Sequence, residues 1–436
     1  MTQIATATTA TPVPPAAGSA RATAAQTRAA ARAHFFTGTP GRMRINAILA
    51  SVISLAFGLT GFFALRALDG AVGRAGANTK QVVRVQQIYT DLLRADAATT
   101  NGFLQGGLEP AALRKTYDDA MARISTNIAD AANAQPADGT ALAALNDKVG
   151  TYATYVSQAR TYNRQTLPVG AQYLTLASQQ LRSDILPIVA NLATANRDRA
   201  ESELRAGSVA IVALVVGLLT LAVLGYIAWW LAHRTHRIVN IPLTAALVLV
   251  AGGLALIVST MLTARSTMTS VRTGDFTSAV QLATARGAAY DAKANESLTL
   301  VRRGSGASYE EAYQKAIGTA RTALTAARYP AGASPDLFGK LTAYDSAHVA
   351  IRRLDDAGNW NQAVSDATTT KDGAANALFD AFDTSSAGIL DEKVTSAVDS
   401  LSRLQRPLFP WLVGLAGVLA AIAASRSMTR RIEEYR

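Results

Sequence analysis

The sequence contains no cysteine in its 436 residues, and charged residues are scarce at 17% against 49% hydrophobic residues. The absence of cysteine excludes a disulfide scaffold, a thiolate zinc site and a cysteine nucleophile. A mean hydropathy of +0.14 is unusually high for a soluble domain. The class of protein therefore depends on the positions of the apolar residues along the sequence.

Four runs contain no Asp, Glu, Lys, Arg or His, at residues 46–65, 206–232, 238–264 and 407–425. About 20 apolar residues, rising ~1.5 Å each, cross a hydrocarbon core roughly 30 Å thick. We therefore predict transmembrane helices at 46–65, 206–232, 241–264 and 407–425. The first follows a 44-residue leader and has no clear small-x-small cleavage site after it, which favours a retained anchor over a cleaved signal peptide.

Positive charge is concentrated in three short pieces of the chain. The leader (residues 1–44) has five arginines and no acid, the turn (233–240) has two arginines, and the tail (426–436) has four arginines against two glutamates. The long segments 66–205 and 265–406 are nearly balanced in charge. The positive-inside rule predicts a multi-pass cell-membrane protein with cytoplasmic N- and C-termini and two extracytoplasmic segments. The pI of 9.9 then reflects the basic residues of the predicted cytoplasmic pieces, and nucleic-acid binding is not predicted.

The two long segments read as helical bundles. Apolar residues recur every three or four positions, as at Val85, Ile88 and Leu92, and no strand-like alternation occurs. Helix breakers divide each segment into four: Gly106 to Pro110, Pro136 to Gly139 and Pro168 in the first, and Gly304 to Gly306, Pro330 to Pro335 and Gly358 in the second. We predict an extracytoplasmic four-helix bundle at 66–205 and another at 265–406, and a disordered leader.

The chain also appears as two similar halves. Residues 67–204 (138 residues) and 266–405 (140 residues) are nearly equal in length, and each is flanked by two apolar runs. Asp96-Ala97 and Asp291-Ala292 begin similar stretches, and a tyrosine-acid sequence follows at Tyr117 and at Tyr309. The fold class predicted is an all-α membrane protein with four transmembrane helices in two parallel repeats, each carrying a helical bundle.

Known catalytic and nucleotide-binding motifs are missing from the sequence. The predicted cytoplasmic pieces are too short for a catalytic domain, so we predict no enzyme activity, catalytic residue, cofactor or metal. His233 and His236 have a metal-ligand spacing, but a turn at the lipid headgroups is the better interpretation. His348 stands without a motif around it. The adjacent carboxylates at Asp118-Asp119 and Asp355-Asp356 are interpreted as solvated charges.

Four residues are candidates for binding a protein partner. Arg164 in the first bundle, and Arg302 with Arg303 in the second, fall near the predicted tips farthest from the membrane, where they could hold an acidic surface. Trp360 lies at a predicted turn, and tryptophan is enriched in binding hot spots. Chance exposure of the arginines and burial of Trp360 against its bundle are the alternative interpretations.

The layout, with the stretches at residues 96–110 and 295–304, resembles the GlnX family of actinobacterial membrane proteins over residues 44–436. The resemblance implies a relay that passes aspartate or glutamate status from an extracytoplasmic solute-binding lipoprotein, GlnH, to the cytoplasmic Ser/Thr kinase PknG. It carries over no catalytic residue. The bundles also resemble chemoreceptor sensor modules, but no methyl-accepting or HAMP region follows.

Other functions stay open at this stage. A stand-alone chemoreceptor-like small-molecule sensor, a transporter accessory protein and an envelope scaffold all fit four spans with large outer segments. The lack of Asp, Glu, Lys, Arg and His in the spans counts against coupled transport and leaves facilitated diffusion open. Small residues four apart, such as Ser54 with Gly58, allow close helix packing in lipid, and a homodimer is also left open.

The predicted orientation gives a direct test. Protease added to intact cells should cut within residues 66–205 and 265–406 and leave the leader intact, because only the bundles face outward. Mass spectrometry of the released peptides measures this. Cleavage confined to the leader would show that the chain is inserted the other way round.

Overall fold

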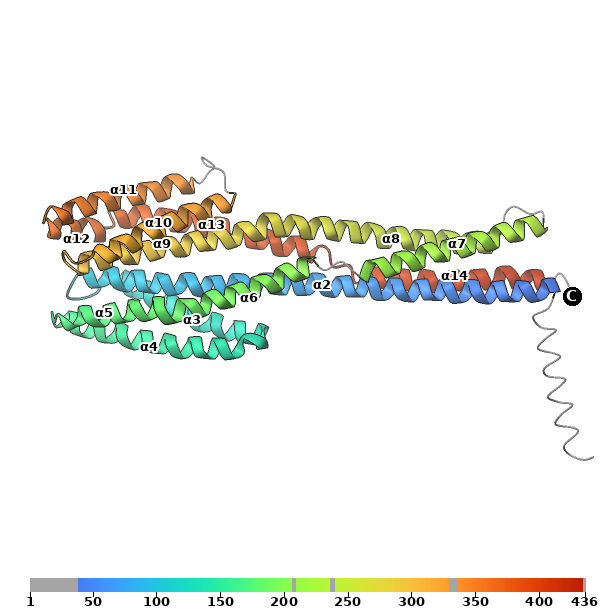
Figure 1. Cartoon of the computed structure of the whole chain (residues 1–436), viewed down its shortest axis with the longest axis horizontal. Helices are drawn as coiled ribbons and strands as arrows, with labels where there is room; N and C mark the ends of the chain where they lie inside the picture. Colours follow the sequence, from blue (N-terminus) through green and yellow to red (C-terminus); the bar gives the residue numbers. More distant parts are fainter. Residues whose placement is uncertain (1–37, 206–208, 236–239, 329–335, 434–436) are drawn as a thin grey trace, which may run out of the picture. The chain divides into compact units, whose positions relative to one another are not determined.

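The computed structural model describes residues 38–205, 209–235, 240–328 and 336–433, and the regular structure in these ranges is helical throughout, without a strand. The chain forms two compact units (Figure 1). The membrane unit comprises Met1–Ala67, Ser208–Met261 and Pro407–Arg436. The bundle unit comprises Leu68–Gly207 and Leu262–Arg406. The predicted class, an all-α membrane protein with four apolar helices, is confirmed.

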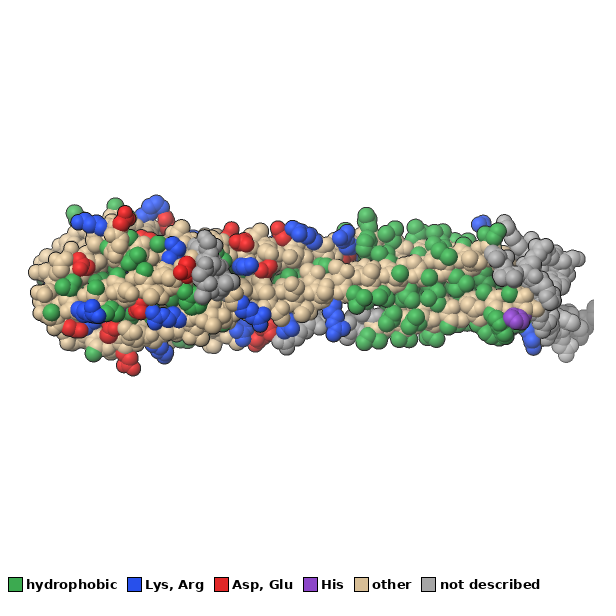
Figure 2. Space-filling view, turned by 90° about the horizontal axis from the view of Figure 1, so that it is seen from above, with side chains coloured by type: hydrophobic (Ala, Val, Ile, Leu, Met, Phe, Trp, Pro, Cys, Tyr) green, Lys and Arg blue, Asp and Glu red, His purple; other side chains and the backbone are tan. Residues whose placement is uncertain are grey.

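The membrane unit is built from the start of α2 (Gly38–Leu104), α7 (Val209–Thr235), the part of α8 (Ile241–Val271) up to Met261, and α14 (Phe409–Glu433). Each has a window long and apolar enough to cross a membrane. Exposed large hydrophobic side chains cover this unit, as Figure 2 shows, which suits a surface in contact with lipid acyl chains.

The expectation of a disordered leader up to residue 44 needs correction, because residues 38–44 belong to α2. The tail expected at 426–436 is helical as far as Glu433, as part of α14. The physical reason is that no helix breaker separates these residues from the apolar runs, and Pro40 is tolerated in the first turn of α2. The rest of the leader, residues 206–208, the turn residues 236–239 and the break at 329–335 lie outside the described residues.

Glycine permits a very close approach between α2 and α14. A Cβ on Gly417 would lie 2.5 Å from the Cα of Gly58, and one on Gly58 would lie 2.9 Å from the Cα of Gly417. Next to this crossing, the Ser51 hydroxyl donates a hydrogen bond to the carbonyl of Ala421 at 3.2 Å. Small residues at the crossing let the two backbones meet, which is how helices associate where lipid offers no hydrophobic driving force.

The bundle unit contains the remaining helices. The first half has the end of α2, then α3 (Ala111–Ala134), α4 (Gly139–Arg164), α5 (Val169–Gln180) and α6 (Leu186–Arg205), with a π-helical turn η2 (Leu181–Ile185) between the last two and a 3₁₀ turn η1 (Pro136–Asp138) before α4. The second half has the π-helical turn η3 (Arg272–Phe276), α9 (Thr277–Val301), α10 (Ala307–Ala326), α11 (Leu337–Asp356), α12 (Trp360–Thr368) and α13 (Ala375–Ser402).

Helix ends follow the breakers closely in the first half. Helix α2 ends two residues before Gly106, α3 begins after Pro110, and α5 begins after Pro168. The second half has one short helix more than expected, because α12 stands between α11 and α13. Gly358 and Gly373 have φ of +80° and +79°, values that glycine adopts readily, and they bracket this extra helix.

One hydrophobic core serves both halves of the bundle unit. The largest cluster of buried residues includes Ile88 and Leu92 of α2 together with Leu282 and Ala285 of α9. Helix α9 is buried almost without interruption from Ala279 to Leu300. Its small side chains allow α2 to come close, so the two bundles pack as a single body.

We predict that Gly417→Ala destabilises the membrane unit, because its Cβ would overlap the backbone of Gly58. Overpacking of this kind costs roughly 1–3 kcal/mol. The thermal unfolding midpoint of the protein in detergent measures the loss. Gly252→Ala is the matched control, since nothing lies within 4 Å of a Cβ there. Equal midpoints for the two variants would contradict the tight crossing.

Candidate functional site

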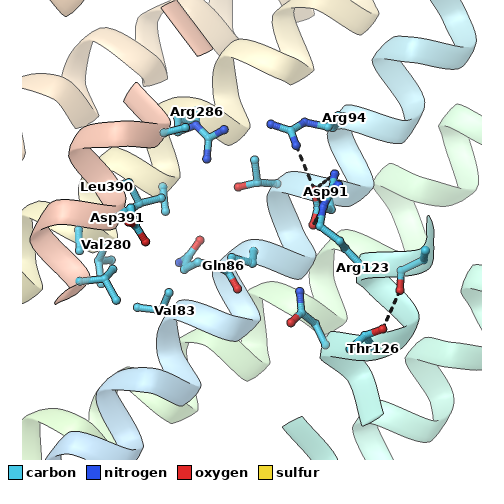
Figure 3. A pocket seen from close by; sticks show the side chains of 18 residues that line it. Val83, Gln86, Asp91, Arg94, Arg123, Thr126, Val280, Arg286, Leu390 and Asp391 are labelled. Atoms are coloured by element: carbon cyan, nitrogen blue, oxygen red, sulfur yellow. Dashed lines mark hydrogen bonds and ion pairs between the residues drawn. The ribbon is translucent and has the colours of Figure 1, made fainter. Parts of the chain in front are cut away.

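A cavity of about 550 Å³ lies between the two bundles (Figure 3). Helices α2 and α3 form one side of it, and α9 and α13 form the other. Its lining residues are Val83, Gln86, Gln87, Thr90, Asp91, Arg94, Ala122, Arg123, Thr126, Asn127, Ala279, Val280, Ala283, Arg286, Ala387, Leu390, Asp391 and Val394. A volume of this size accommodates a small molecule.

An alternating chain of charges runs along the cavity from α3 to α9. Arg123 Nη2 donates to Asp91 Oδ1 at 2.8 Å, and Arg94 Nη1 lies 3.6 Å from the same oxygen. Arg94 Nη2 then donates to Asp383 Oδ2 at 3.0 Å, and Arg286 Nη2 donates to Asp383 Oδ1 at 2.6 Å. Three guanidinium groups thus share two carboxylates across the interface between the bundles.

Other polar side chains of the cavity are left without partners. Gln86, Gln87, Asn127 and Asp391 make no hydrogen bond or ion pair with the part of the chain that the structure describes. Because unpaired polar groups beside apolar walls can hydrogen-bond a ligand, the cavity offers both kinds of contact that a binding site needs.

A second set of charges is buried closer to the end of α2. Asp96 is fully buried and accepts hydrogen bonds from Ser178 Oγ at 2.7 Å and Arg182 Nη1 at 2.9 Å. Arg182 Nη2 also donates to Asp291 Oδ1 at 2.7 Å, which ties the first bundle to α9. The pKa of Arg182 is raised: burial opposes its charge, but Asp96 and Asp291 outweigh that effect. The guanidinium therefore stays charged and holds the bundles together.

His348 lies at the centre of a third buried cluster, inside the second bundle. Its Nδ1 lies 3.0 Å from Glu296 Oε2, and its Nε2 lies 3.0 Å from Glu310 Oε2. The imidazole stacks on the ring of Tyr313 at a centroid distance of 3.4 Å. Lys293 Nζ donates to the other oxygen of Glu296 at 2.6 Å. Both ring nitrogens face carboxylate oxygens, an arrangement that favours the doubly protonated imidazolium.

Titration of this cluster follows from its contacts. Burial lowers the pKa of His348, but the hydrogen bonds and charges of Glu296 and Glu310 outweigh it, so the pKa is raised above 6.5. Burial raises the pKa of Glu310, but His348, Gln314 and Arg352 outweigh it, so that pKa is lowered. The cluster is therefore fully charged in the window between these two pKa values.

The structure brings together two of the four partner-binding candidates. The guanidinium of Arg303 lies 3.8 Å above the ring centre of Trp360, and Trp360 Nε1 donates to the carbonyl of Leu300 at 2.9 Å. Trp360 is half-buried, and it caps the end of α9 while it supports the exposed Arg303. Arg302 is the C-cap of α9, and its Nε has no hydrogen-bond partner among the described residues.

Arg164 lies apart from these three, at the exposed end of α4. It lines a small cavity of about 140 Å³ together with Glu109, Arg114 and Arg160. Glu109 is held there by Arg160, whose Nε lies 2.8 Å from Oε2.

Sequence reasoning did not find the cavity between the bundles or the cluster around His348. Asp91, Arg94, Arg286 and Asp383 are scattered over three helices, and no spacing along the chain joins them. Of the carboxylates interpreted as solvated, Asp118 and Asp119 pair with Arg114 and Lys115 on an exposed helix face. Asp355 departs from that interpretation, because its side chain is only 8% exposed and is paired with Arg352.

No group of three or more His, Asp or Glu side chains in the described ranges is arranged to hold a metal ion. The acidic side chains that come together are paired with arginine, lysine or histidine instead.

Part of the chain matches a known protein family. Residues 71–205, which form the first bundle, match the sequence model of the actinobacterial sensor domain. Among curated proteins, none matches this chain. Together with the four helices long and apolar enough to cross a membrane, this match supports a membrane protein with a sensing or signalling role. The second bundle lies outside the matched residues.

We predict that His348→Gln lowers the free energy of unfolding by roughly 1–3 kcal/mol at a pH below 6.5, where the imidazolium is fully formed in both states. A raised folded-state pKa contributes stability that is complete below the unfolded value and is lost as the pH rises through the folded value. The difference between wild type and variant should therefore shrink in alkaline solution.

Denaturant unfolding at several pH values measures this difference. Lys315→Gln, which removes an exposed cation from the neighbouring α10, is the control and should leave the pH dependence unchanged. If His348→Gln lowers the free energy of unfolding by the same amount at every pH, His348 stabilises the bundle by packing alone.

Proposed function

We propose that this protein is a non-enzymatic transmembrane signal relay. In this proposal the bundle unit faces outward and receives aspartate or glutamate status from a GlnH-like solute-binding lipoprotein. The leader, turn and tail present the result to a PknG-like Ser/Thr kinase in the cytoplasm. The sensor-domain match over residues 71–205 is the observation that carries the proposal.

The connection between the two units supports a relay. Helix α2 is one uninterrupted helix from Gly38 to Leu104, so the residues of its apolar window and those of the first bundle belong to the same element. The second half is similarly connected through α8, η3 and α9. In this proposal, a change within either bundle is passed to a candidate membrane helix along the same stretch of helical backbone.

A relay also needs two arrangements of its helices that a partner binds with different affinity. A ligand with equal affinity for both arrangements does not shift the equilibrium between them. The interface between the bundles is suited to this. Besides the shared apolar core, it contains ion pairs around a cavity, and these can exchange partners at a lower cost than closely packed apolar side chains. A partner that prefers one arrangement would shift the equilibrium between them.

The partners are tested by crosslinking in native membranes, followed by pulldown of the full chain and mass spectrometry. The relay predicts recovery of an extracytoplasmic binding protein and a cytoplasmic kinase. Recovery of neither, with substrate flux through liposomes that contain the purified protein, would replace the relay by transport.

We predict that Arg303→Ala and Trp360→Ala each reduce recovery of the outer binding protein about tenfold, because they remove an exposed cation and the ring that supports it. Lys315→Ala removes the same charge from an exposed position on α10 and should leave recovery unchanged. Thermal unfolding of each variant separates a binding defect from a folding defect. Full recovery with both variants would exclude this tip as the contact.

A further inference from the structure

We propose that the cavity between the bundles is a binding site for a small organic monocarboxylate with an apolar body. This inference goes beyond the relay, since it concerns a ligand bound directly by the bundle unit and requires neither outer nor inner partner. Three properties of the cavity support it: the arginines at one end, the aliphatic side chains of the walls and the polar side chains without a hydrogen-bond partner.

The charge of the cavity favours an anion at one end. Three guanidinium groups (Arg94, Arg123 and Arg286) share two carboxylates (Asp91 and Asp383), and the third carboxylate of the cavity, Asp391, lies away from Arg94, so positive charge is in excess at the arginine end alone. The side chain of Arg286 is only 10% exposed, and its Nη1 makes no hydrogen bond with any described residue, since Nε and Nη2 both donate to Asp383. A carboxylate there would complete the pairing, and a partly buried guanidinium binds carboxylate strongly.

The walls favour an apolar body attached to that carboxylate. Helices α9 and α13 contribute only aliphatic side chains to their part of the lining, apart from Arg286 and Asp391. These aliphatic residues are Ala279, Val280, Ala283, Ala387, Leu390 and Val394. The three alanines leave room that larger residues would fill. An inorganic anion would gain nothing from these walls, whereas an apolar body would be stabilised by the removal of its surface from water.

Asp391 limits the ligand to one carboxylate. Figure 3 places it beside Val280 and Leu390, away from Arg94, and it has no ion-pair partner in the described residues. A second carboxylate at that end of the ligand would meet a like charge. Gln86, Gln87 and Asn127 also lack partners and can bond a neutral polar group on the ligand body.

Such a ligand would contact both bundles at once. Arg123 and Gln86 belong to the first bundle, whereas Arg286 and Leu390 belong to the second. A ligand bound in the cavity would therefore favour the arrangement in which the spacing of the four surrounding helices fits the ligand.

The test uses the purified full chain in lipid nanodiscs and isothermal titration with phenylacetate, 4-methylpentanoate and indole-3-acetate. Titrations of empty nanodiscs correct for partition into lipid. The neutral amides of the three acids and inorganic phosphate complete the panel. We expect saturable binding of at least one acid, and at least tenfold weaker binding of its amide and of phosphate, because the site needs both charge and apolar contact.

Two pairs of variants locate the site. Ala387→Phe fills the cavity and should abolish binding, whereas Thr384→Phe, one turn earlier on α13, exposed and outside the lining, should preserve it. Arg123→Gln should weaken binding at least tenfold, whereas Arg114→Gln, on the same helix α3 and outside this cavity, should not. The side chain of Arg123 is 43% exposed, so its replacement should disturb folding little. Arg123→Gln therefore still tests the site if Ala387→Phe fails to fold.

The proposal is overturned if none of the three acids binds saturably, or if the amides or phosphate bind as tightly as the acids. Binding that survives both Ala387→Phe and Arg123→Gln also overturns it, because the acid would then occupy another place. None of these results bears on the recovery of protein partners, so the failure of this inference and the failure of the relay are distinguishable.

Discussion

Charge buried between packed helices has to be paired, and this constraint determines how the two bundles are joined. Burying an unpaired charge costs several kcal/mol, so a buried guanidinium and its carboxylates fix each other's positions. Asp96, Arg182 and Asp291 form one such link, and Arg94 with Asp383 forms another. Together with the shared apolar core, the buried Asp96–Arg182–Asp291 link sets the register between α2 and α9.

The same pairing explains why the bundle unit is well suited to sensing. A closely packed apolar core has a single good arrangement, but a chain of three arginines and two aspartates has several ways to share its bonds. An incoming anion changes which of them is favoured. The structural cost of switching is then an exchange of hydrogen bonds around a cavity that already exists.

The sequence alone was sufficient to predict the four candidate spans, the class of fold and most helix ends. Spans follow from uncharged runs, and Pro110, Pro168 and Gly358 act locally on the backbone, so their effects are visible in the chain itself. The extra helix α12 was missed because Gly373 was not recognised as a second break.

The site could not be predicted in the same way. Arg94 and Asp383 are 289 positions apart, and their meeting depends on how α2 and α13 pack. His348 carried no motif, and its two glutamates come from different helices. Arg303 and Trp360 were chosen separately as exposed tip residues. Their stacking depends on the turn after α9, where Arg303 has a φ of +38°.

The π-helical turns carry a consequence for motion along the helices. A π turn holds one residue more than an α-helical turn of the same span, and such turns are frequent at functional sites. One of them, η3 at Arg272–Phe276, joins α8 to α9, and the other, η2 at Leu181–Ile185, contains Arg182. If the extra residue of η3 passed along the helix, every side chain it crossed would rotate by about 100° around the axis. Such a passage would exchange backbone hydrogen bonds one at a time, so the side chains of α9 would turn about the helix axis while the helix stays formed.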